Sequence, residues 1–290
     1  MEHYPVMAAE ALDYLAIRPD GIYVDATAGL GGHTGQIAER LSSGLVIAND
    51  RDATSLARAR ENTREWSERI RYHHGAFSSI AEAMAEAGVE KAHGLLADLG
   101  VSRYQLTAPE RGFSFLSDGP LDMRLDQTSG ITAADLVNHM PERELADLIF
   151  QLGEERRARR IARAIVRARP LRSTLHLADV VERAAYRTSR IHPATQTFMA
   201  LRMKVNEEPE ELDRLLATAP ELLYPGGRMV VISFMSSDDR KVKERFRQLG
   251  REGKAVILTK RPLQPSDEET AKNPASRSAK LRALERVEEE

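Results

Sequence analysis

The sequence predicts an α/β fold: a doubly wound, Rossmann-like sheet interrupted by an inserted helical domain. In the first hundred residues, β-rich apolar runs alternate with helical patterns, as is typical of a parallel sheet with helices on both faces. A long segment of helical periodicity follows, and an apolar strand pattern then returns. We therefore expect residues 1–102 and 209–290 to form the Rossmann-like domain and residues 103–208 to form the insertion.

The expected elements follow the chain in this order. Strands are expected over residues 21–27, 45–50, 70–75 and 94–100. Between them, helices are expected near residues 33–41, 54–66 and 79–87, and the last begins with Ser79-x-x-Glu82, a pattern typical of a capping box. Residues 101–129 have neither periodicity and are rich in Gly, Pro, Asp and aromatic residues, so we expect a long ordered loop.

The pattern is helical from residue 141 to about residue 206. Apolar residues recur at helical spacing over residues 149–166, and the opposite stripe carries Arg156, Arg160, Arg163 and Arg167. A helix over residues 210–223, a turn at Tyr224-Pro-Gly-Gly227 and a strand over residues 228–234 then return to α/β. A helix near residues 238–249, a short strand over 255–259 and a segment over 278–287 close the chain.

The formal net charge of −2 hides a strong asymmetry. From Arg156 to Asn206 there are 13 Lys and Arg residues against two acids, Asp179 and Glu182, so this stretch is +11 and the rest is −13. A basic module on an acidic body suggests a polyanionic partner, with RNA only weakly favoured over DNA.

Composition excludes several classes of protein. The chain has no cysteine, which rules out disulfides, zinc–thiolate sites and thiol nucleophiles. The histidines show no metal-ligand spacing, so we expect no metal. No apolar run approaches the roughly 20 residues of a membrane span, and no leader pattern is present, so we expect a cytoplasmic protein without a membrane partner.

The loop after the first strand, Asp25-Ala-Thr-Ala-Gly-Leu-Gly-Gly-His-Thr34, is the strongest candidate for a cofactor site. Ligands of open α/β sheets bind beyond the carboxyl ends of the strands, and glycines let the backbone approach a ligand closely. The second strand ends at Asp50, where an acid accepts hydrogen bonds from ribose hydroxyls. The loop lacks the full G-x-G-x-x-G pattern that holds a pyrophosphate, so a nucleoside cofactor without phosphates fits better than NAD. A plain tight turn is the alternative.

Two further segments carry candidate chemistry. Asp98-Leu-Gly-Val-Ser102 follows the fourth strand and places a carboxylate beside the expected cofactor, although such an acid is often only a turn former. The stretch from Arg111 to Asp126 mixes arginines, phenylalanines and acids, which suits a flipped-out base. The alternatives are a self-packed loop and a Mg²⁺ site.

The chain resembles the bacterial family of 16S rRNA cytosine-N4 methyltransferases nearly from end to end. The first matching segments are His3-Tyr-Pro-Val6, Asp25-x-Thr-x-Gly-x-Gly-Gly-His-Thr34, Asp98-Leu-Gly-Val-Ser102 with Gln105, and Arg111-Gly-Phe-Ser-Phe with Asp118-Gly-Pro-Leu-Asp-Met-Arg124. Further matches are Gly153-Glu-Glu155, His192-Pro-Ala-Thr195, Ala200-Leu-Arg202, Val205-Asn206, Pro225-Gly-Gly-Arg228 and Asn273-Pro274 with Arg277-Ser278. Each is weak alone, but the ordered set is specific.

The resemblance implies a class I methyltransferase fold that uses S-adenosyl-L-methionine to methylate N4 of a decoding-centre cytidine of 16S rRNA, within the small ribosomal subunit. It implies cofactor contacts from Gly31, Gly32, His33, Asp50, Phe77, Asp98 and Gln105. We expect RNA contacts from Arg111, Phe115, Arg124, Arg160, Arg163, Arg202 and Asn206. The oligomeric state stays open, and a homodimer is one option.

Cytidine N4 is a target that this chain can methylate without a cysteine. Methylation of pyrimidine carbon 5 generally needs a covalent cysteine, whereas an exocyclic nitrogen attacks directly once it is aligned with the methyl group. Asp98, Asp118 and Asp122 are the candidate catalytic carboxylates. A non-catalytic ribosome-assembly factor that keeps the fold is the main alternative, and a nucleotide-dependent oxidoreductase is a second.

Two positions depart from the family pattern. Met235-Ser-Ser-Asp-Asp-Arg240 stands where the family usually has His-Ser-Leu-Glu-Asp-Arg, and Met199 stands where it usually has Gln. If either family residue touches the cytidine or a phosphate, affinity or rate is affected here, whereas the cofactor loop is unchanged.

Overall fold

The computed structural model describes residues 5–185 and 192–288, with the side chain of Arg103 left out. The chain forms two compact units, residues 1–100 with 210–290 and residues 101–209, and each is described by itself. In the described residues, no helix is long and apolar enough to cross a membrane.

The first unit is built around a seven-stranded sheet with the order β3-β2-β1-β4-β5-β7-β6. The first five strands in the chain run parallel, and β7 pairs antiparallel with both β5 and β6. The strands are β1 (Ile22–Asp25), β2 (Leu45–Asp50), β3 (Ile70–His74), β4 (Ala92–Asp98), β5 (Leu223–Ser233), β6 (Ala255–Ile257) and β7 (Lys280–Arg286).

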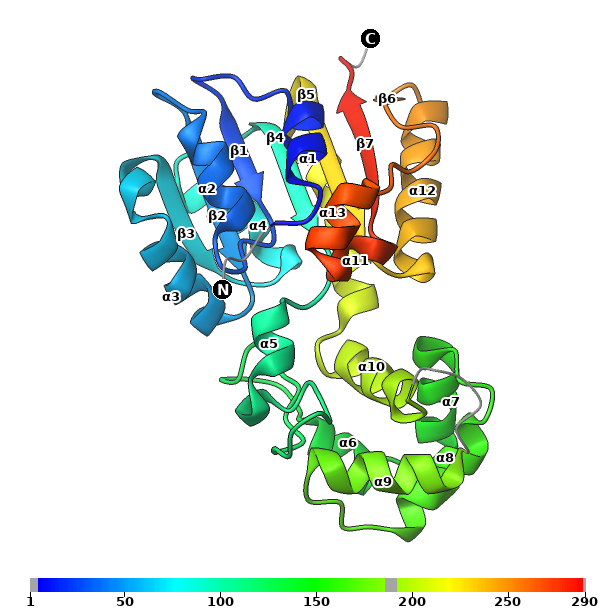
Figure 1. Cartoon of the computed structure of the whole chain (residues 1–290). Helices are drawn as coiled ribbons and strands as arrows, with labels where there is room; N and C mark the ends of the chain where they lie inside the picture. The colour runs from blue at the N-terminus through cyan, green and yellow to red at the C-terminus, as the bar shows by residue number, and fades with distance from the viewer. Residues whose placement is uncertain (1–4, 186–191, 289–290) are drawn as a thin grey trace. The chain divides into compact units, whose positions relative to one another are not determined.

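Helices cover both faces of this sheet, which is why its strands are apolar almost throughout (Figure 1). Along β2, Val46 and Ala48 belong to one hydrophobic cluster while Ile47 belongs to the other, as the alternation of side chains along a strand requires. The helices of this unit are α1 (Ala8–Leu15), α2 (Gly32–Glu39), α3 (Ala53–Asn62), α4 (Ile80–Glu86), α11 (Glu208–Thr218, which begins at the boundary), α12 (Ser236–Arg251) and α13 (Asp267–Lys272). Short 3-10 turns, η1 (Arg64–Arg69), η2 (Phe77–Ser79), η4 (Ala219–Leu222) and η5 (Pro274–Ser278), join them.

The second unit is helical and has its own hydrophobic core. Its elements are α5 (Arg103–Thr107), η3 (Pro109–Arg111), α6 (Ala133–His139), α7 (Glu142–Gly153), α8 (Ala158–Arg167), α9 (Thr174–Ala184) and α10 (Ala194–Val205). Phe113, Leu121 and Met123, from the segment that joins η3 to α6, are buried in the same core. This core therefore fixes the segment as well as the helices.

Four local predictions are wrong. The expected loop over residues 101–129 contains α5 and η3, because Ser102 and Gln105 form a reciprocal capping box that begins a helix. The helix expected over residues 149–166 is broken, since α7 ends at Gly153 and Glu154 takes a left-handed φ of 53°. Gly153 is needed there because a Cβ would lie 2.6 Å from the carbonyl oxygen of Gln196.

The two other wrong predictions concern the residues at which β5 begins and the capping of α4. Tyr224-Pro-Gly-Gly227 lies inside β5 as an irregularity, where the pairing with β4 shifts register and Gly226 has a φ of 76°. Ser79 precedes α4, but its hydroxyl donates to the Ala76 carbonyl and makes no cap bond to the helix. His3 and Tyr4 of the matched N-terminal segment, and Arg187 and Arg190 of the basic stretch, lie outside the described residues.

Candidate functional site

The loop between β1 and α2 is held in place by Asp25, the last residue of β1. Its buried carboxylate accepts a hydrogen bond from the Thr27 amide at 3.1 Å and another from the Thr34 hydroxyl at 2.6 Å. Burial raises the pKa of Asp25, while the nearby His33 and these hydrogen bonds favour its charged form. Asp25 thus joins the start of the loop to the first turn of α2.

Asp50, at the end of β2, contacts the same loop from the neighbouring strand. One carboxylate oxygen accepts from the Gly29 amide at 2.7 Å and the other accepts from the Asp52 amide at 2.8 Å. Burial, with the charges of Asp52 and Asp25, raises the pKa of Asp50 to about 6. A carboxylate has about four lone-pair positions, so Asp50 still has room to accept hydrogen bonds from ribose hydroxyls.

Asp98, at the end of β4, completes the arrangement. Its amide donates to the Thr27 hydroxyl at 2.7 Å, so the loop bridges the ends of β1 and β4. One carboxylate oxygen lies 3.5 Å from Nε2 of His33, and the other is buried with no hydrogen-bond partner in the described structure. A buried oxygen without a partner is costly, which indicates that a ligand supplies the missing donor.

His33 lies in the first turn of α2 and is only 5% exposed. Both ring nitrogens are buried without a hydrogen bond within the described residues. Burial opposes protonation, but the carboxylates of Asp98, Asp25 and Glu269 outweigh it and raise the pKa of His33. His33 and Asp98 are therefore a pair of buried polar groups with unused bonding capacity at the carboxyl edge of the sheet.

The glycines of the loop are needed for its backbone path. Gly31 has a φ of 88°, and a Cβ there would lie 2.9 Å from the Thr63 methyl group. At Gly32, a Cβ would meet the ring of Pro5 at 3.2 Å. Side chains of Thr63 and Pro5 therefore pack directly against the backbone at these two positions, which only glycine allows.

The charges around this loop favour a cofactor without phosphates. Asp25, Asp50, Asp52 and Asp98 surround it, and Glu269 of α13 contributes to the field at His33. A pyrophosphate would be repelled by such a set of carboxylates, whereas a cationic sulfonium and a ribose would be stabilised. The residues present therefore fit S-adenosylmethionine better than NAD.

Two predicted cofactor contacts lie outside this cluster. Phe77 is half-buried in η2, after β3, and packs against the hydrophobic cluster that includes Ile80. Gln105 lies in the second unit, is 5% exposed, and its side chain accepts from the Ser102 amide at 2.8 Å. The side-chain oxygen of Gln105 is thus used in the helix cap. The contact of Gln105 with the cofactor stays a prediction.

Some groups in the cofactor region were missed by sequence reasoning. Asn49 donates to the carbonyls of Ala26 and Gly75, at 3.3 and 3.0 Å, while its own side-chain oxygen is buried and has no partner among residues 5–185 and 192–288. Glu269 accepts from the Met7 amide at 2.7 Å and thereby joins α13 to the N-terminal segment. The position of Asn49 beside Asp50 was a usable signal, whereas no local pattern connects Glu269 with a residue 262 positions earlier.

In the second unit, several predicted RNA contacts have structural partners. Arg111 is 3% exposed and donates at 3.0 Å to the carbonyls of Arg124 and Leu125. Asn206 is also buried, where it accepts from the Leu125 amide and donates to the Met123 carbonyl, both at 2.7 Å. These two side chains hold the segment before α6 in shape.

The remaining residues of this segment are also engaged. Arg124 donates to both carboxylate oxygens of Asp122, at 2.8 and 3.0 Å. Burial opposes ionisation of Asp122, yet Arg124 outweighs it, so the pKa of Asp122 is lowered. Phe115 packs edge-on against Phe198, with ring centroids 4.9 Å apart.

Asp118 belongs to the segment between η3 and α6, and its carboxylate contacts the first turn of α9. Its carboxylate accepts from the Leu175 amide at 3.2 Å. The Ser173 side chain is the main cause of its lowered pKa. Neither Asp118 nor Asp122 therefore has the raised pKa of a proton carrier.

The arginine stripe is exposed along α8. Ala158, Ile161, Ala162 and Ile165 are buried, whereas Arg159, Arg160, Arg163 and Arg167 face solvent. Arg163 lies 3.4 Å from Glu142, both well exposed, and such a pair is weak. By contrast, Arg202 is bound through two hydrogen bonds of 2.8 Å to Glu208. Among the described residues of this unit, α8 therefore presents a run of exposed arginines to solvent.

The two positions that depart from the resemblance lie in different units. Met235 follows β5, the parallel neighbour of β4, so it lies at the same edge of the sheet as Asp98. Met199 lies in α10 and is half-buried. Within the described part of the chain, no group of three or more His, Cys, Asp or Glu residues is placed to hold a metal ion.

Comparison with known proteins gives a consistent result. A family model described as the MraW methylase family matches residues 1–287. The chain is 72% identical over 283 residues to the "Ribosomal RNA small subunit methyltransferase H" of Solibacter usitatus, covering 98% of this chain and 99% of that protein. The protein of the same name from Acidobacterium capsulatum is 50% identical, with 98% of each chain covered. Among solved structures, an rRNA methylase from Streptococcus thermophilus matches with a TM-score of 0.49 at 12% identity, over 99% of this chain and all of that one.

Proposed function

The chain belongs to the MraW methylase family, and on that premise we propose that it methylates N4 of one cytidine in the ribosomal RNA of the small subunit. The relatives at 72% and 50% identity carry the name of a small-subunit rRNA methyltransferase and span the whole chain. The structural observation that best supports this chemistry is the His33–Asp98 pair beside the glycine loop. In the described residues, buried polar atoms of both side chains have no hydrogen-bond partner.

Family membership confirms the predicted resemblance, the enzyme class and the cofactor: the chain is an S-adenosylmethionine-dependent methyltransferase. The seven-stranded sheet with helices on both faces confirms the predicted α/β fold class. The identity of the methylated nucleotide, the roles of single residues and the domain roles are proposals.

The proposed cofactor site uses the three strand ends that meet at the glycine loop. Asp50 accepts hydrogen bonds from the ribose hydroxyls, and the backbone at Gly31 and Gly32 lies against the cofactor. His33 can donate a hydrogen bond to the polar end of the cofactor, and the carboxylate of Asp98 can accept one. When bound, S-adenosylmethionine supplies an electrophilic methyl carbon on a positively charged sulfur.

Asp98 is the carboxylate that we propose to orient the attacking amino group. Its backbone is fixed to Thr27, and its buried oxygen is available to accept an N–H hydrogen bond. Positive charge develops on N4 during attack, and a fixed carboxylate in a buried site stabilises it. The proton can leave after methyl transfer, so a strong general base is not required. Asp118 and Asp122, whose oxygens already accept hydrogen bonds in the second unit, are the alternative candidates.

We propose that the second unit binds the RNA. The exposed arginines of α8 would neutralise phosphates, while Arg111 and Asn206 shape the segment that receives the base. A substrate in the small ribosomal subunit would place the enzyme in the cytoplasm, and a homodimer stays an option.

Methyl transfer by carboxylate variants tests this assignment. We would compare Asp98→Asn, Asp118→Asn and Asp122→Asn in transfer of labelled methyl groups to small subunits that lack the modification, with exposed Asp20→Asn as the matched control. Loss of one charge-assisted hydrogen bond predicts a rate lower by about ten- to a hundredfold in Asp98→Asn. Wild-type turnover in that variant, with loss in Asp118→Asn or Asp122→Asn, would move the role to the second unit.

A further inference from the structure

A groove in the first unit carries positive charge that neither the fold nor the cofactor site uses. It lies between α12 and the segment Ala255–Lys260, which contains the edge strand β6. Its volume is about 670 Å³. The lining residues are Glu244, Arg247, Gly250, Arg251, Ala255, Ile257 and Lys260, and an adjoining hollow adds Lys243.

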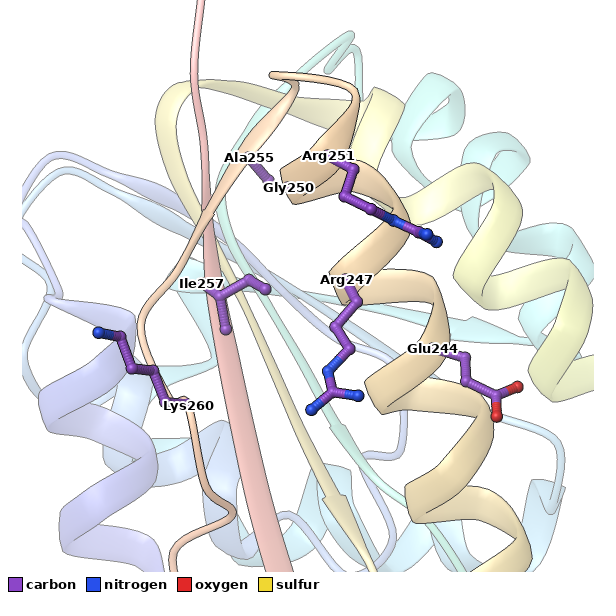
Figure 2. Close-up of a pocket in the computed structure, with 7 residues that line it drawn as sticks. All are labelled: Glu244, Arg247, Gly250, Arg251, Ala255, Ile257 and Lys260. Atoms are coloured by element: carbon purple, nitrogen blue, oxygen red, sulfur yellow. The ribbon is translucent and has the colours of Figure 1, made fainter.

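The cations form a ladder along one side of α12. Lys243, Arg247 and Arg251 are spaced at i, i+4 and i+8, so each lies one turn above the last, about 6 Å along the helix axis. Figure 2 shows Lys260 and Arg247 on opposite sides of Ile257, with the carboxylate of Glu244 pointing away from Lys260. The groove therefore has cationic residues on both sides of an apolar floor, and in this view the charged ends of Lys260 and Arg251 are directed outward, away from Ile257.

These cations are not engaged within the described part of the chain. Arg247, Arg251 and Lys260 are exposed and have no hydrogen bond or ion pair there. Other cations of the same helix do have structural partners: Lys241 pairs with Asp213 at 2.6 Å, and Arg245 donates to the Leu216 carbonyl at 3.1 Å. Like charges at i and i+4 repel and destabilise a helix, so the ladder does not serve the stability of α12.

The shape and chemistry of the groove fit a phosphodiester strand. Cations on two walls match a chain of phosphates, and the floor of Ala255 and Ile257 fits the apolar face of a sugar. Gly250 keeps the floor open, because a Cβ there would already be 3.4 Å from Ile257. Among the described residues no aromatic side chain lines the groove, and Phe246 of the adjoining hollow is only 1% exposed, so no aromatic face is presented for stacking a base.

We propose that this groove is a second RNA-binding surface, which holds the sugar–phosphate backbone of the substrate RNA in a sequence-independent manner. The inference rests on the proposed function, since it takes small-subunit ribosomal RNA as the substrate. It adds to the arginines of α8 a set of phosphate contacts on the methyltransferase unit itself.

The test is the triple variant Arg247→Gln, Arg251→Gln, Lys260→Gln. Each lost phosphate contact lowers the slope of log K against log salt by about 0.7 for a single strand, so three contacts lower it by about 2. At 0.1 M salt we expect affinity for ribosomal RNA to fall on the order of tenfold or more. KM for the RNA substrate should rise, while kcat and the dissociation constant for S-adenosylhomocysteine stay unchanged.

A matched control separates this groove from net charge. The triple variant Arg40→Gln, Arg58→Gln, Arg64→Gln removes the same charge from exposed arginines near α2, α3 and η1, on the side of the sheet that ends in β3. Its salt slope and RNA affinity should remain close to those of the wild type. Equal losses in both triples would overturn the proposal, because they would reflect overall charge alone.

A second measurement does not depend on loss of affinity. The chain has no cysteine, so Lys260→Cys gives a unique thiol for a photoactivatable crosslinker. Crosslinks to ribosomal RNA, absent from Arg64→Cys, are expected. If the wild type methylates the RNA, but the triple variant keeps the wild-type salt slope and Lys260→Cys gives no RNA crosslink, the proposal that the groove binds RNA is overturned and the proposed function is not. Failure of the wild type to methylate would instead overturn the proposed function.

Discussion

Asp50, which we propose to bind the ribose hydroxyls of the cofactor, should make cofactor affinity depend on pH near 6. Its pKa is raised to about 6 by burial and by the neighbouring charges of Asp52 and Asp25. The charged carboxylate is the form that accepts hydrogen bonds from ribose hydroxyls, so affinity should fall as the pH drops through about 6.

The size of the effect follows from that pKa. With a pKa of about 6, roughly nine-tenths of Asp50 is charged at pH 7 and roughly one-tenth at pH 5, so affinity should fall about tenfold over that range. The same shift affects folding. A carboxyl whose pKa is raised by folding favours the folded state at low pH, and this contribution is lost as the pH rises from 3.8 through about 6, by up to about 3 kcal/mol.

Calorimetric titration with S-adenosylhomocysteine between pH 5 and 8 measures this effect. Asp50→Asn removes the titrating group, so its affinity should be about ten- to a hundredfold weaker at pH 7.5 and flat through pH 6. Despite burial, the neighbouring carboxylates raise the pKa of His33, but its contribution is common to both proteins and cancels in their comparison. The reasoning fails if Asp50→Asn keeps the wild-type pH profile.

Two further substitutions test the local geometry. Gly31→Ala should lower the free energy of unfolding by about 1–3 kcal/mol in urea titrations, because φ is 88° and Thr63 is too close, whereas Gly29→Ala, whose nearest neighbour is at 3.8 Å, should cost less. Equal costs would mean that contact with Thr63 is not the cause. Asn206→Ala removes the acceptor of the part-buried Leu125 amide and the donor to the buried Met123 carbonyl, so it should cost about 1–3 kcal/mol and speed hydrogen exchange at the Leu125 amide. Unchanged exchange there would contradict the role given to Asn206.

The parts of the fold that follow local rules could be predicted from the sequence. The strand expected over residues 45–50 is found as β2, Leu45–Asp50, because both its faces are buried and every position but the last two is apolar. The glycine loop and the acids at the ends of β2 and β4 also follow from the rule that ligand sites lie at strand ends. These residues predict a nucleoside cofactor, and family membership confirms the methyltransferase class that the resemblance implied.

Features that depend on distant residues could not be predicted. α7 ends where Gly153 packs against the carbonyl of Gln196, a contact 43 positions away in the sequence that no local pattern reveals. The buried role of Arg111 needs carbonyl partners at Arg124 and Leu125, whereas its sequence setting favoured a phosphate contact. β7 carries four charged residues among its seven, and its antiparallel pairing with β5 joins residues 47 to 57 positions apart in the sequence.

Nucleoside analysis of methylated ribosomal RNA tests the central claim most directly. Small subunits that lack the modification would be incubated with the enzyme and labelled S-adenosylmethionine, and the RNA would then be digested and separated. The account predicts label in N4-methylcytidine at a single site. Label in another nucleoside would contradict the proposed target, and cofactor binding without incorporation would contradict the proposed activity.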